Sequence, residues 1–518
     1  ADDHPRLALE PLMSAAEGLI FGLGVALQPT IMLYCLIGVV LGTLIGVLPG
    51  IGAMAAISLL LPITYYIPPE AALVMLAGVY YGSQYGGAVA SILLRLPGTP
   101  QSVVTALDGY PMTQQGRAGV ALFASMVSSF AGSILGIVVL VLLASWLSAV
   151  ATSFGAADYA AMMVLGLVAA STIGAGAPAK ALAMVVLGLI LGCVGTDVNS
   201  GVQRLNFGST QLMDGINLVA LAMGLFGVAE VIGGIRGAER HGVPERVSFA
   251  QMMPCRDDAR RMVGPTLRGT GVGSFFGALP GTGSTISSFL SYALERRIAR
   301  RPERFGKGAI EAVAGPEAAN NAAVAGTLAP LLSLGLPTSA TAAILLAAFQ
   351  QYGLQPGPLL FESNPELVWG MMASLYIGNV LLLILNLPMA PVWVKLLKIP
   401  RPWLYGGILL FATLGTYTLN NNVADLVILW IIGLVGFGMR VLDVPVAPAV
   451  VGLILGPLAE QQFRRALAIS EGDPSVFFTH PLSLVILIIA TTLAIAPAVL
   501  RYRARRKAQA AGIADQPA

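Results

Sequence analysis

Long stretches without charge recur along the whole chain, and they constrain its fold more than any other feature. The stretches 367–387, 423–439 and 482–500 are nearly free of charged residues. A helix needs about 20 apolar residues to cross a bilayer. Only 11% of the 518 residues are charged, against about 25% in average soluble domains. The sequence therefore predicts an all-α, polytopic transmembrane protein with roughly ten or more helices.

The basic residues gather in four clusters, and these set the expected orientation in the membrane. Loops rich in Lys and Arg stay in the cytoplasm. All four clusters, including the C-terminal tail, are therefore expected on the cytoplasmic side of a bacterial inner membrane. The clusters lie at 236–268, 296–307, 395–401 and 501–507.

Several kinds of chemistry find no support in the sequence. The three cysteines and three histidines are scattered, which argues against a disulfide framework and a zinc site. No G-x-x-x-x-G-K-[ST] phosphate loop occurs, so no ATP hydrolysis is expected. No H-E-x-x-H or G-x-S-x-G motif and no signal peptide is recognised either. We therefore expect neither an enzyme nor a nucleic-acid-binding protein.

The most informative pattern is an internal duplication. Residues 38–52 read GVVLGTLIGVLPGIG, and residues 269–283 read GTGVGSFFGALPGTG. Glycines four apart lie on one helix face and let another helix approach closely. The Leu-Pro-Gly-x-Gly ending instead breaks the helix within an apolar stretch. Broken backbone at membrane depth survives where it is buried or lines a cavity, and paired breaks mark the binding sites of transporters.

The charges predict how the second copy enters the membrane. Arg268 precedes it and Arg296 follows it, and both flanks are expected in the cytoplasm. Two full crossings would need about 40 residues, which is more than the segment holds. We therefore expect 269–294 to form a re-entrant hairpin that turns at 279–283. By pseudo-symmetry, 38–62 should turn at its own Leu-Pro-Gly and enter from the opposite side.

Each half also carries a second break. Residues 96–102 read LPGTPQS, and residues 336–341 read LPTSAT. Both place hydroxyl groups beside a proline, where they either bind a ligand or bond back to helix carbonyls. We expect the four breaks to meet in one midplane cavity between two inverted, pseudo-symmetric halves. The expected organisation is an N-terminal segment 1–17, a first half 18–235, a cytoplasmic linker 236–268, a second half 269–500 and a cytoplasmic tail 501–518.

A broken helix offers two kinds of ligand. Free N–H groups at the start of a half-helix attract carboxylates, and free C=O groups at the end of one attract cations. Neutral hydroxyls and amides suit Na⁺ or an anionic substrate. The expected substrate-binding residues are Gly50, Gly52, Arg95, Gly98, Thr99, Gly281, Gly283, Ser284, Asn320, Asn321, Thr338 and Ser339. The expected Na⁺ ligands are Pro49, Gly50, Ser83, Thr282, Asn321, Pro337 and Thr338.

The charged residues near the breaks are few. Arg95 directly precedes the first-half break, and it either pairs with a substrate carboxylate or snorkels to the membrane interface. Asp108, Glu311 and Glu317 are each a proton or cation site, or else a loop or helix-end residue. The coupling ion is expected to be Na⁺, with H⁺ as the alternative.

The chain resembles the large membrane subunit of the bacterial tripartite tricarboxylate transporters over about residues 18–500. The matching stretches are GVLPGIG at 46–52, LAGVYYGSQYGG at 76–87, SVVTALDGYPM at 102–112, LGCVGTDVNSGV at 191–202, ALAMGLFGVAE at 220–230, PERFGKGAIEAVAGPEAANNAA at 302–323, QPGPLLF at 355–361 and SEGDPSVF at 470–477.

This resemblance implies a permease that works with a small four-helix membrane subunit and a periplasmic solute-binding protein. It implies uptake of citrate or another organic carboxylate, driven by an ion gradient through an elevator-like movement of hairpins. The first-half break departs from the family pattern Asn-Leu-Pro-Gly-Glu, because it reads Arg95-Leu96-Pro97-Gly98-Thr99. The second-half break reads Gly335-Leu336-Pro337-Thr338-Ser339 instead of Gly-Ile-Pro-Ser-Asn. The ligand set therefore differs, and the rival interpretation is a channel-like or uniport pore.

Overall fold

A computed structural model describes most of the chain. The described residues are 14–48, 52–95, 99–151, 153–172, 178–197, 200–213, 215–234, 252–281, 283–396 and 401–510. They are predominantly helical, and one short antiparallel pair, β1 Gly195–Thr196 with β2 Gln203–Arg204, accompanies the helices. The predicted helical fold is confirmed in this respect.

The helices up to the basic segment are α1 Ala15–Ala26, α2 Pro29–Val47, α3 Gly52–Thr64, α4 Pro69–Leu94, α5 Ser102–Gln114, α6 Ala118–Ala151, α7 Ala156–Thr172, α8 Pro178–Gly192, the 3₁₀ turn η1 Thr210–Leu212, α9 Leu218–Ala222, the π-helix η2 Met223–Val228 and α10 Ala229–Gly234. Those after it are α11 Arg256–Ala278, α12 Gly283–Ile298, the 3₁₀ turn η4 Pro302–Arg304, α13 Glu311–Leu334, α14 Ala340–Gln351, α15 Pro358–Ser363, α16 Pro365–Leu396, α17 Arg401–Asn420, α18 Val423–Val441, α19 Ala447–Ile469, α20 Val476–Thr479 and α21 Pro481–Ala510.

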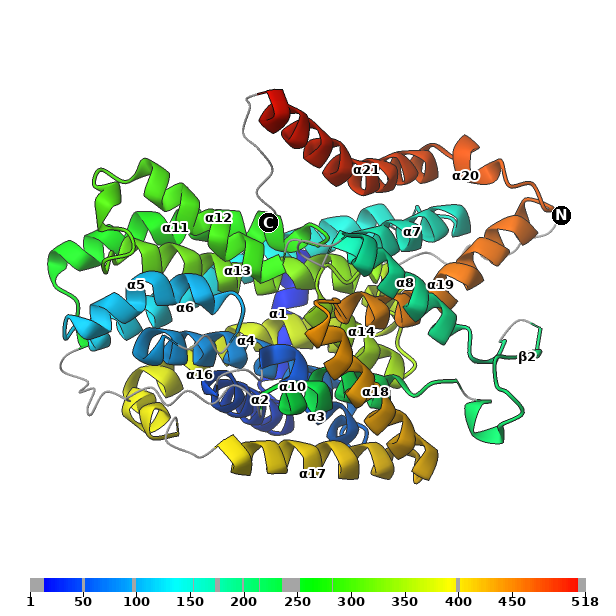
Figure 1. Cartoon of the computed structure of the whole chain (residues 1–518), viewed down its shortest axis with the longest axis horizontal. Helices are drawn as coiled ribbons and strands as arrows, with labels where there is room; N and C mark the ends of the chain where they lie inside the picture. Colours follow the sequence, from blue (N-terminus) through cyan, green and yellow to red (C-terminus); the bar gives the residue numbers. More distant parts are fainter. Residues whose placement is uncertain are drawn as a thin grey trace.

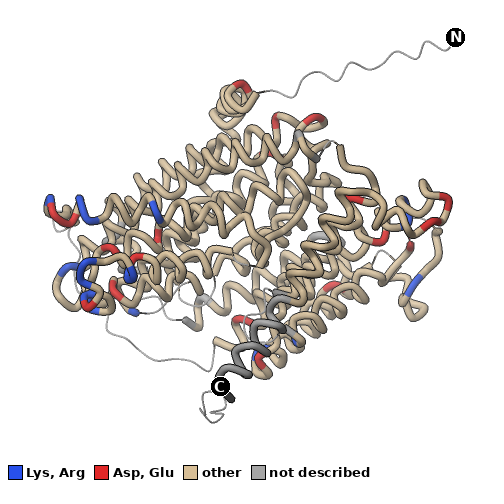
Figure 2. Tube along the Cα trace, turned by 90° about the horizontal axis from the view of Figure 1, so that it is seen from above, with Lys and Arg blue, Asp and Glu red and all other residues tan. Residues whose placement is uncertain are grey.

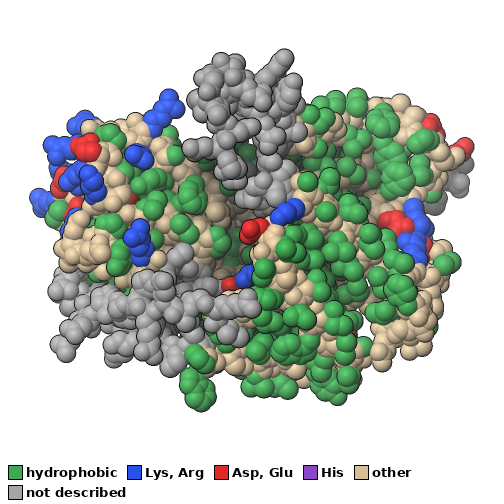
Figure 3. Space-filling view, in the orientation of Figure 1, with side chains coloured by type: hydrophobic (Ala, Val, Ile, Leu, Met, Phe, Trp, Pro, Cys, Tyr) green, Lys and Arg blue, Asp and Glu red, His purple; other side chains and the backbone are tan. Residues whose placement is uncertain are grey.

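The helices and the surface have the character of a multi-pass membrane protein. Within the described part of the chain, 4 helices are long and apolar enough to span a bilayer: α2, most of α6 and α16, and α18. Charged residues gather toward the ends of the molecule and are scarce between them (Figure 2). Hydrophobic side chains cover much of the described face in Figure 3, whereas basic side chains cluster at the end where α11 and α12 lie.

The first row of glycines packs α2 against α4. A Cβ added to Gly38 would lie 2.2 Å from the carbonyl oxygen of Met75, so only glycine permits this approach of the two backbones. Gly42 and Gly46 meet Val79 and Ser83 of α4 in the same way.

The second row of glycines packs α11 against α13. A Cβ on Gly273 would lie 2.2 Å from the carbonyl oxygen of Ala319. Gly269 and Gly277 lie against Gly315 and Ala323 of α13. The predicted helix-packing role of both rows is therefore seen in the structure.

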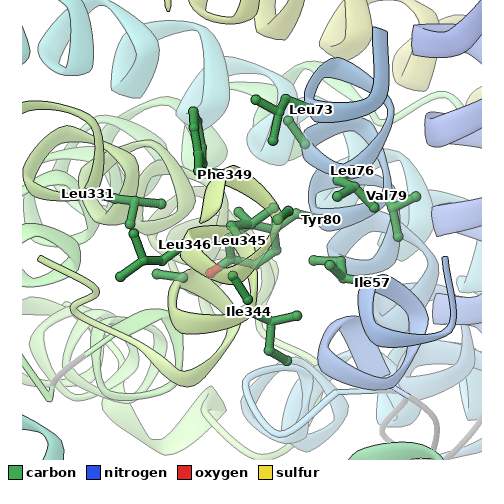
Figure 4. Packing of buried hydrophobic residues seen from close by; sticks show 14 of the residues in the cluster. Ile57, Leu73, Leu76, Val79, Tyr80, Leu331, Ile344, Leu345, Leu346 and Phe349 are labelled. Carbon is green, nitrogen blue, oxygen red and sulfur yellow. The ribbon is translucent and has the colours of Figure 1, made fainter. Parts of the chain in front are cut away.

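The helices that follow the breaks interlock the two halves. In the first half, α3 packs against α4 and also against α14 of the second half. In the second half, α12 packs against α13 and also against α5 of the first half. Figure 4 shows the apolar side of one such junction, where Ile57 of α3, Leu76 of α4 and Phe349 of α14 lie in one cluster.

Helices α11 and α12 form a hairpin (Figure 1). Arg268 on the first arm binds Glu295 on the second, with Nε–Oε1 at 2.8 Å and Nη2–Oε2 at 2.7 Å. A helical hairpin is thus present and its re-entrant course through the membrane stays a prediction; α11 begins at Arg256, inside the segment expected to be a linker. The reason is tertiary: basic residues of this segment form ion pairs, such as Arg261 with Glu311 at 2.7 Å, which hold the helix against α13.

The remaining helices pack around this centre. One group consists of α7, α8, α19 and α21, which contact one another. A second group consists of η2, α10, α17 and α18, and α3 packs against η2 and α17. In Figure 1 the first group lies largely above and to the right of the second.

Candidate functional site

The tip of the α11–α12 hairpin is bonded to the second break of the same half. Gly281 and Gly283 have φ of 79° and 53°, a left-handed conformation that glycine adopts without steric cost. The backbone N–H of Gly281 donates to the carbonyl oxygen of Thr338 at 3.0 Å. The hydroxyls of Thr338 and Thr327 both donate to the carbonyl oxygen of Gly277, at 3.0 and 3.2 Å. The α11 end, the tip and the break between α13 and α14 therefore form one unit.

Tyr80 connects the first half to this unit. It lies on α4 and is 3% exposed. Its hydroxyl lies near four hydroxyl-bearing residues of the second half: Ser284, Thr327, Ser339 and Thr341. Figure 4 shows the ring reaching from α4 toward α14. One buried side chain thus meets both breaks of the opposite half.

A second connection runs through two glutamines. Gln101, in the loop after the first-half break, donates from Nε2 to Oε1 of Gln84 on α4. The hydroxyl of Thr285, at the start of α12, donates to Oε1 of Gln101 at 3.4 Å. The Ser102 hydroxyl holds the same loop by donating to the carbonyl oxygen of Thr99 at 2.7 Å. The first-half break and the second-half tip therefore lie together.

We call this connected set of neutral polar residues the break cluster. Its members are Tyr80, Gln84, Thr99, Gln101, Ser284, Thr285, Thr327, Thr338, Ser339 and Thr341. Two of its buried side-chain atoms, Gln84 Nε2 and Thr99 Oγ1, have no hydrogen-bond partner among the residues that the structure describes. Buried polar atoms are almost always paired, so we expect water or a ligand to meet these two atoms.

The expected residues of the second half come together in this cluster. Gly281, Gly283, Ser284, Thr338 and Ser339 form the hairpin tip and the neighbouring break. Pro337 lies in the same loop between α13 and α14.

The two asparagines of α13 differ from each other. Asn320 is 1% exposed, and within the described part of the chain neither its Nδ2 nor its Oδ1 has a hydrogen-bond partner. Asn321 instead donates from Nδ2 to the Ser129 hydroxyl at 2.8 Å and to the Glu317 carbonyl oxygen at 3.0 Å. Only Asn320 therefore has its whole amide free for a ligand.

The expected residues of the first half are more dispersed. Gly52 begins α3 with φ of 64°, and Thr99 joins the break cluster. Ser83 donates its hydroxyl to the Tyr80 carbonyl oxygen at 2.7 Å, within the α2–α4 contact. Arg95 caps α4 in a left-handed conformation and is exposed, so it does not lie inside the break cluster. The predicted ligands Pro49, Gly50, Gly98 and Thr282 lie outside the described residues.

Sequence reasoning missed several members of the cluster. Tyr80, Gln84, Gln101, Thr327 and Thr341 were not among the expected ligands. Their signal is a polar or aromatic side chain in an apolar, glycine-rich helix, as in GVYYGSQYGG, or directly after a break. The spacing of apolar residues along a helix does not indicate which of these polar side chains face the opposite half of the chain.

Two of the three acidic candidates have structural partners. Asp108 accepts backbone N–H groups from Gly306, Gly308 and Ala309 at 2.8–2.9 Å, and so holds the loop before α13. Glu311 begins α13 and pairs with Arg261. Both therefore fit the loop or helix-end alternative.

A cavity of about 720 Å³ reaches the end of α13. It is bounded by Leu334 and Gly335, where α13 ends, and by parts of α7, α14, α15 and α19. Its polar lining includes Gln350, Gln462, the basic Arg465 and the acidic Glu362. The opposite end of α13, at Glu311, is bound to the basic segment of α11. The cavity thus approaches the second-half break from the side away from that basic segment.

Comparisons with known proteins identify the family. The model of the tripartite tricarboxylate transporter TctA family matches residues 32–451. An Agrobacterium vitis protein described as "Uncharacterized 52.8 kDa protein in TAR-I ttuC' 3'region" is 43% identical, over 96% of this chain and 98% of its own length. A second one from that organism, "Uncharacterized protein in TAR-II ttuC' 3'region", is 44% identical over 45% of this chain and 97% of its own length. No solved structure matches. The chain belongs to the tripartite tricarboxylate transporter TctA family.

Proposed function

We propose that this chain is the permease subunit that carries an organic carboxylate, of the dicarboxylate or tricarboxylate class, across the bacterial inner membrane. The observation that carries the proposal is that three breaks meet: the Gly281 N–H donates to the Thr338 carbonyl oxygen at 3.0 Å, and the Thr285 hydroxyl donates to Oε1 of Gln101 at 3.4 Å. Interrupted helices of the two halves thereby share one buried, neutral polar cluster. That arrangement is typical of transporter binding sites.

The substrate carboxylates would bind at the helix starts that follow the breaks. The first N–H groups of a helix have no partner within it, and its dipole favours an anion there. Helices α5, α12 and α14 begin beside the break cluster, and α3 begins at the remaining break. Ser284, Thr285 and Thr341 add hydroxyl donors. No cluster member is charged, so we propose that dipoles and hydroxyls hold the anion.

The same breaks would hold the coupling ion. We propose Na⁺, with H⁺ as the alternative, bound by backbone carbonyls near Pro337 and Thr338 and by amide oxygens. Among the described residues the Oδ1 atoms of Asn320 and Asn321 lack a hydrogen-bond partner, which supports this proposal because amide oxygens are ligands of hard cations. An elevator-like movement of two inverted halves would then carry both ligands across.

We propose further that the substrate enters through the cavity beside Gly335. A periplasmic binding protein would release the anion there, and a small membrane subunit would complete the system, as the word tripartite in the family description suggests. The C-terminus would lie in the cytoplasm. Arg465 and the glutamines of the cavity would attract the carboxylate before it reaches the break cluster.

The test is uptake of labelled organic acids into liposomes that contain this chain and its small membrane partner. Purified binding protein is added or withheld, and a Na⁺ or H⁺ gradient is imposed. Saturable uptake that needs both the binding protein and one gradient is the expected result. Flux that needs neither the binding protein nor an ion gradient, and that runs only down the solute gradient, would favour the rival channel-like pore and overturn the proposal.

A further inference from the structure

Two adjacent arginines near the end of α19 have different surroundings. Arg464 pairs with Asp197, which follows β1, at 3.1 Å and with Glu460 of its own helix at 2.6 Å. Arg465 lines the cavity beside Gly335, and none of the ion pairs formed by the described residues includes it. Arg464 is therefore a structural residue, whereas the guanidinium group of Arg465 is available to an anion in the cavity.

One acid lines the same cavity. Glu362 lies on α15 and, like Arg465, is exposed. No ion pair joins the two side chains, and among the described residues none joins Glu362 to another base. A cavity with one free cation and one free anion can bind a ligand that carries a carboxylate and a hydrogen-bond donor.

The rest of the cavity suits a small polar ligand. Its volume of about 720 Å³ lies within the range of about 300–1,000 Å³ that is typical of small-molecule sites. Amide side chains come from Gln350 of α14, Gln462 of α19 and Gln355 in the loop before α15, and most other lining residues are apolar. A largely apolar wall with a few polar groups is the usual composition of a ligand site.

The cavity extends well away from the break cluster. Helix α14 begins after Ser339, a member of that cluster, and Gln350 lies near its other end. At 1.5 Å per residue the rise between these two residues is about 16 Å, so a small organic acid at Gln350 does not reach Ser339. At its inner end the cavity is bounded by Gly335, which is close to Thr338 in the break. The outer part of the cavity is thus a place of its own on the way to the break cluster.

We propose that this outer part is a selectivity site for hydroxydicarboxylates, in which Arg465 binds one carboxylate and Glu362 accepts the ligand's hydroxyl. A guanidinium group binds a carboxylate through two parallel hydrogen bonds, and the glutamine amides donate to the second carboxylate. A third carboxylate would face Glu362, and like charges in contact are unfavourable. The inference rests on the proposed transport function and narrows its substrate class, because the site disfavours tricarboxylates.

The experiment measures uptake of labelled succinate, malate and citrate into liposomes with the full chain, its small membrane partner and one binding protein. Because the same binding protein serves every variant, its own preference cancels when variants are compared. Glu362→Gln should raise citrate uptake relative to malate by roughly fivefold, the size of one like-charge contact in water. Glu362→Ala removes the hydroxyl acceptor and should erase the preference for malate over succinate.

Arg465→Gln tests the carboxylate contact. It should raise KM for all three probes by about tenfold, because hydrogen bonds to charged groups are the stronger ones, and Arg465→Lys should retain most of the affinity. Arg464→Gln is the matched control: it breaks the ion pairs with Asp197 and Glu460, so it should lower stability and leave KM unchanged. Glu366→Gln, at an exposed acid of α16 outside the cavity, should leave the citrate-to-malate ratio unchanged.

The outcomes separate the inference from the proposed function. If the wild type transports none of the probes under any gradient, the transport proposal fails and the inference fails with it. If the wild type transports a probe while Glu362→Gln keeps its citrate-to-malate ratio and Arg465→Gln keeps its KM, only the selectivity site is overturned. An Arg465→Gln protein that does not fold would show a structural role for Arg465 and would also overturn the inference.

A second measurement needs no transport. A ligand that binds the folded state raises the unfolding midpoint, so the midpoint of the purified chain in detergent is recorded with malate and with citrate. Malate should stabilise the wild type more than Arg465→Gln, and Glu362→Gln should narrow the difference between malate and citrate. Equal shifts in the wild type and in both variants would overturn the inference.

Discussion

The backbone N–H of Gly281 donates a hydrogen bond to the carbonyl oxygen of Thr338 at 3.0 Å. This bond joins the tip of the α11–α12 hairpin to the break between α13 and α14. The Thr338 hydroxyl donates a second hydrogen bond to the same hairpin, to the carbonyl oxygen of Gly277 on α11 at 3.0 Å. Two breaks of one half are therefore bonded to each other, and a ligand between them would meet both at once.

Thr338→Val should loosen this pair. The variant keeps the side-chain shape but loses one hydrogen bond, which costs about 1 kcal/mol of the free energy of unfolding. The Gly277 carbonyl oxygen still accepts from Thr327 at 3.2 Å, so the protein should fold. We expect lower uptake in liposomes and a small drop in the thermal unfolding midpoint.

The control for this variant is Thr413→Val. Thr413 makes a comparable bond, to the Leu409 carbonyl oxygen at 2.8 Å, but within α17. It should lose similar stability and keep full uptake. Equal uptake losses in both variants would mean that the Thr338 effect is one of stability alone.

Tyr80→Phe should weaken substrate binding without disturbing the fold. It removes the hydroxyl that lies near Ser284 and Ser339 and keeps the ring that packs between α4 and α14. Loss of one hydrogen bond between this hydroxyl and the substrate, about 1 kcal/mol, corresponds to roughly a fivefold rise in KM for uptake. Tyr66→Phe, which removes an exposed hydroxyl bound to the Thr418 carbonyl oxygen, should leave KM unchanged. An unchanged KM in Tyr80→Phe would remove Tyr80 from the site.

Much of the local structure could be predicted from the sequence. The helices α2 and α11 end at Val47 and Ala278, directly before the Leu-Pro pairs that indicated the breaks. The helices α4 and α13 end in left-handed residues, Arg95 and Gly335, at the second breaks. These features are local, because proline and glycine act on the backbone where they stand.

The partners across the molecule could not be predicted in the same way. The contact of Tyr80 with Ser284, and that of α3 with α14, join residues far apart in the sequence. A glycine row indicates that a helix packs closely, but it does not name the helix. For the same reason the basic segment before Arg268 was expected to be a linker, since its ion pairs with α12 and α13 exist only in the folded chain.

Gly273→Ala should destabilise the protein, because the added methyl group would lie 2.2 Å from the Ala319 carbonyl oxygen. Overpacking of this kind costs about 1–3 kcal/mol. Gly271→Ala is a matched control on the same helix, since a Cβ there meets nothing within 4 Å. Thermal unfolding in detergent should show a lower midpoint for Gly273→Ala and an equal or higher one for Gly271→Ala. The glycine row would lose its proposed packing role if both variants unfolded together.

Asn320→Ala should reduce uptake with little effect on stability. Both side-chain polar atoms of Asn320 are buried without a partner among the described residues, so the truncation breaks no hydrogen bond seen in that part of the chain and removes an unpaired amide. If that amide binds substrate or Na⁺, KM for one of them should rise by about tenfold for a loss of 1.4 kcal/mol.

Asn321→Ala removes an amide that, unlike that of Asn320, has hydrogen-bond partners within the protein. It breaks the bond to Ser129 at 2.8 Å, so we expect lower stability and also reduced uptake, with expression retained. Measuring the unfolding midpoint and the Na⁺ and substrate dependence of uptake in both variants separates the two roles. Wild-type uptake by well-expressed Asn320→Ala would exclude its amide as a ligand, and the same result for Asn321→Ala would exclude that residue too. A loss of uptake without a loss of stability in Asn320→Ala would instead place the ligand beside α13, one turn from Glu317 and on the same helix as Thr327.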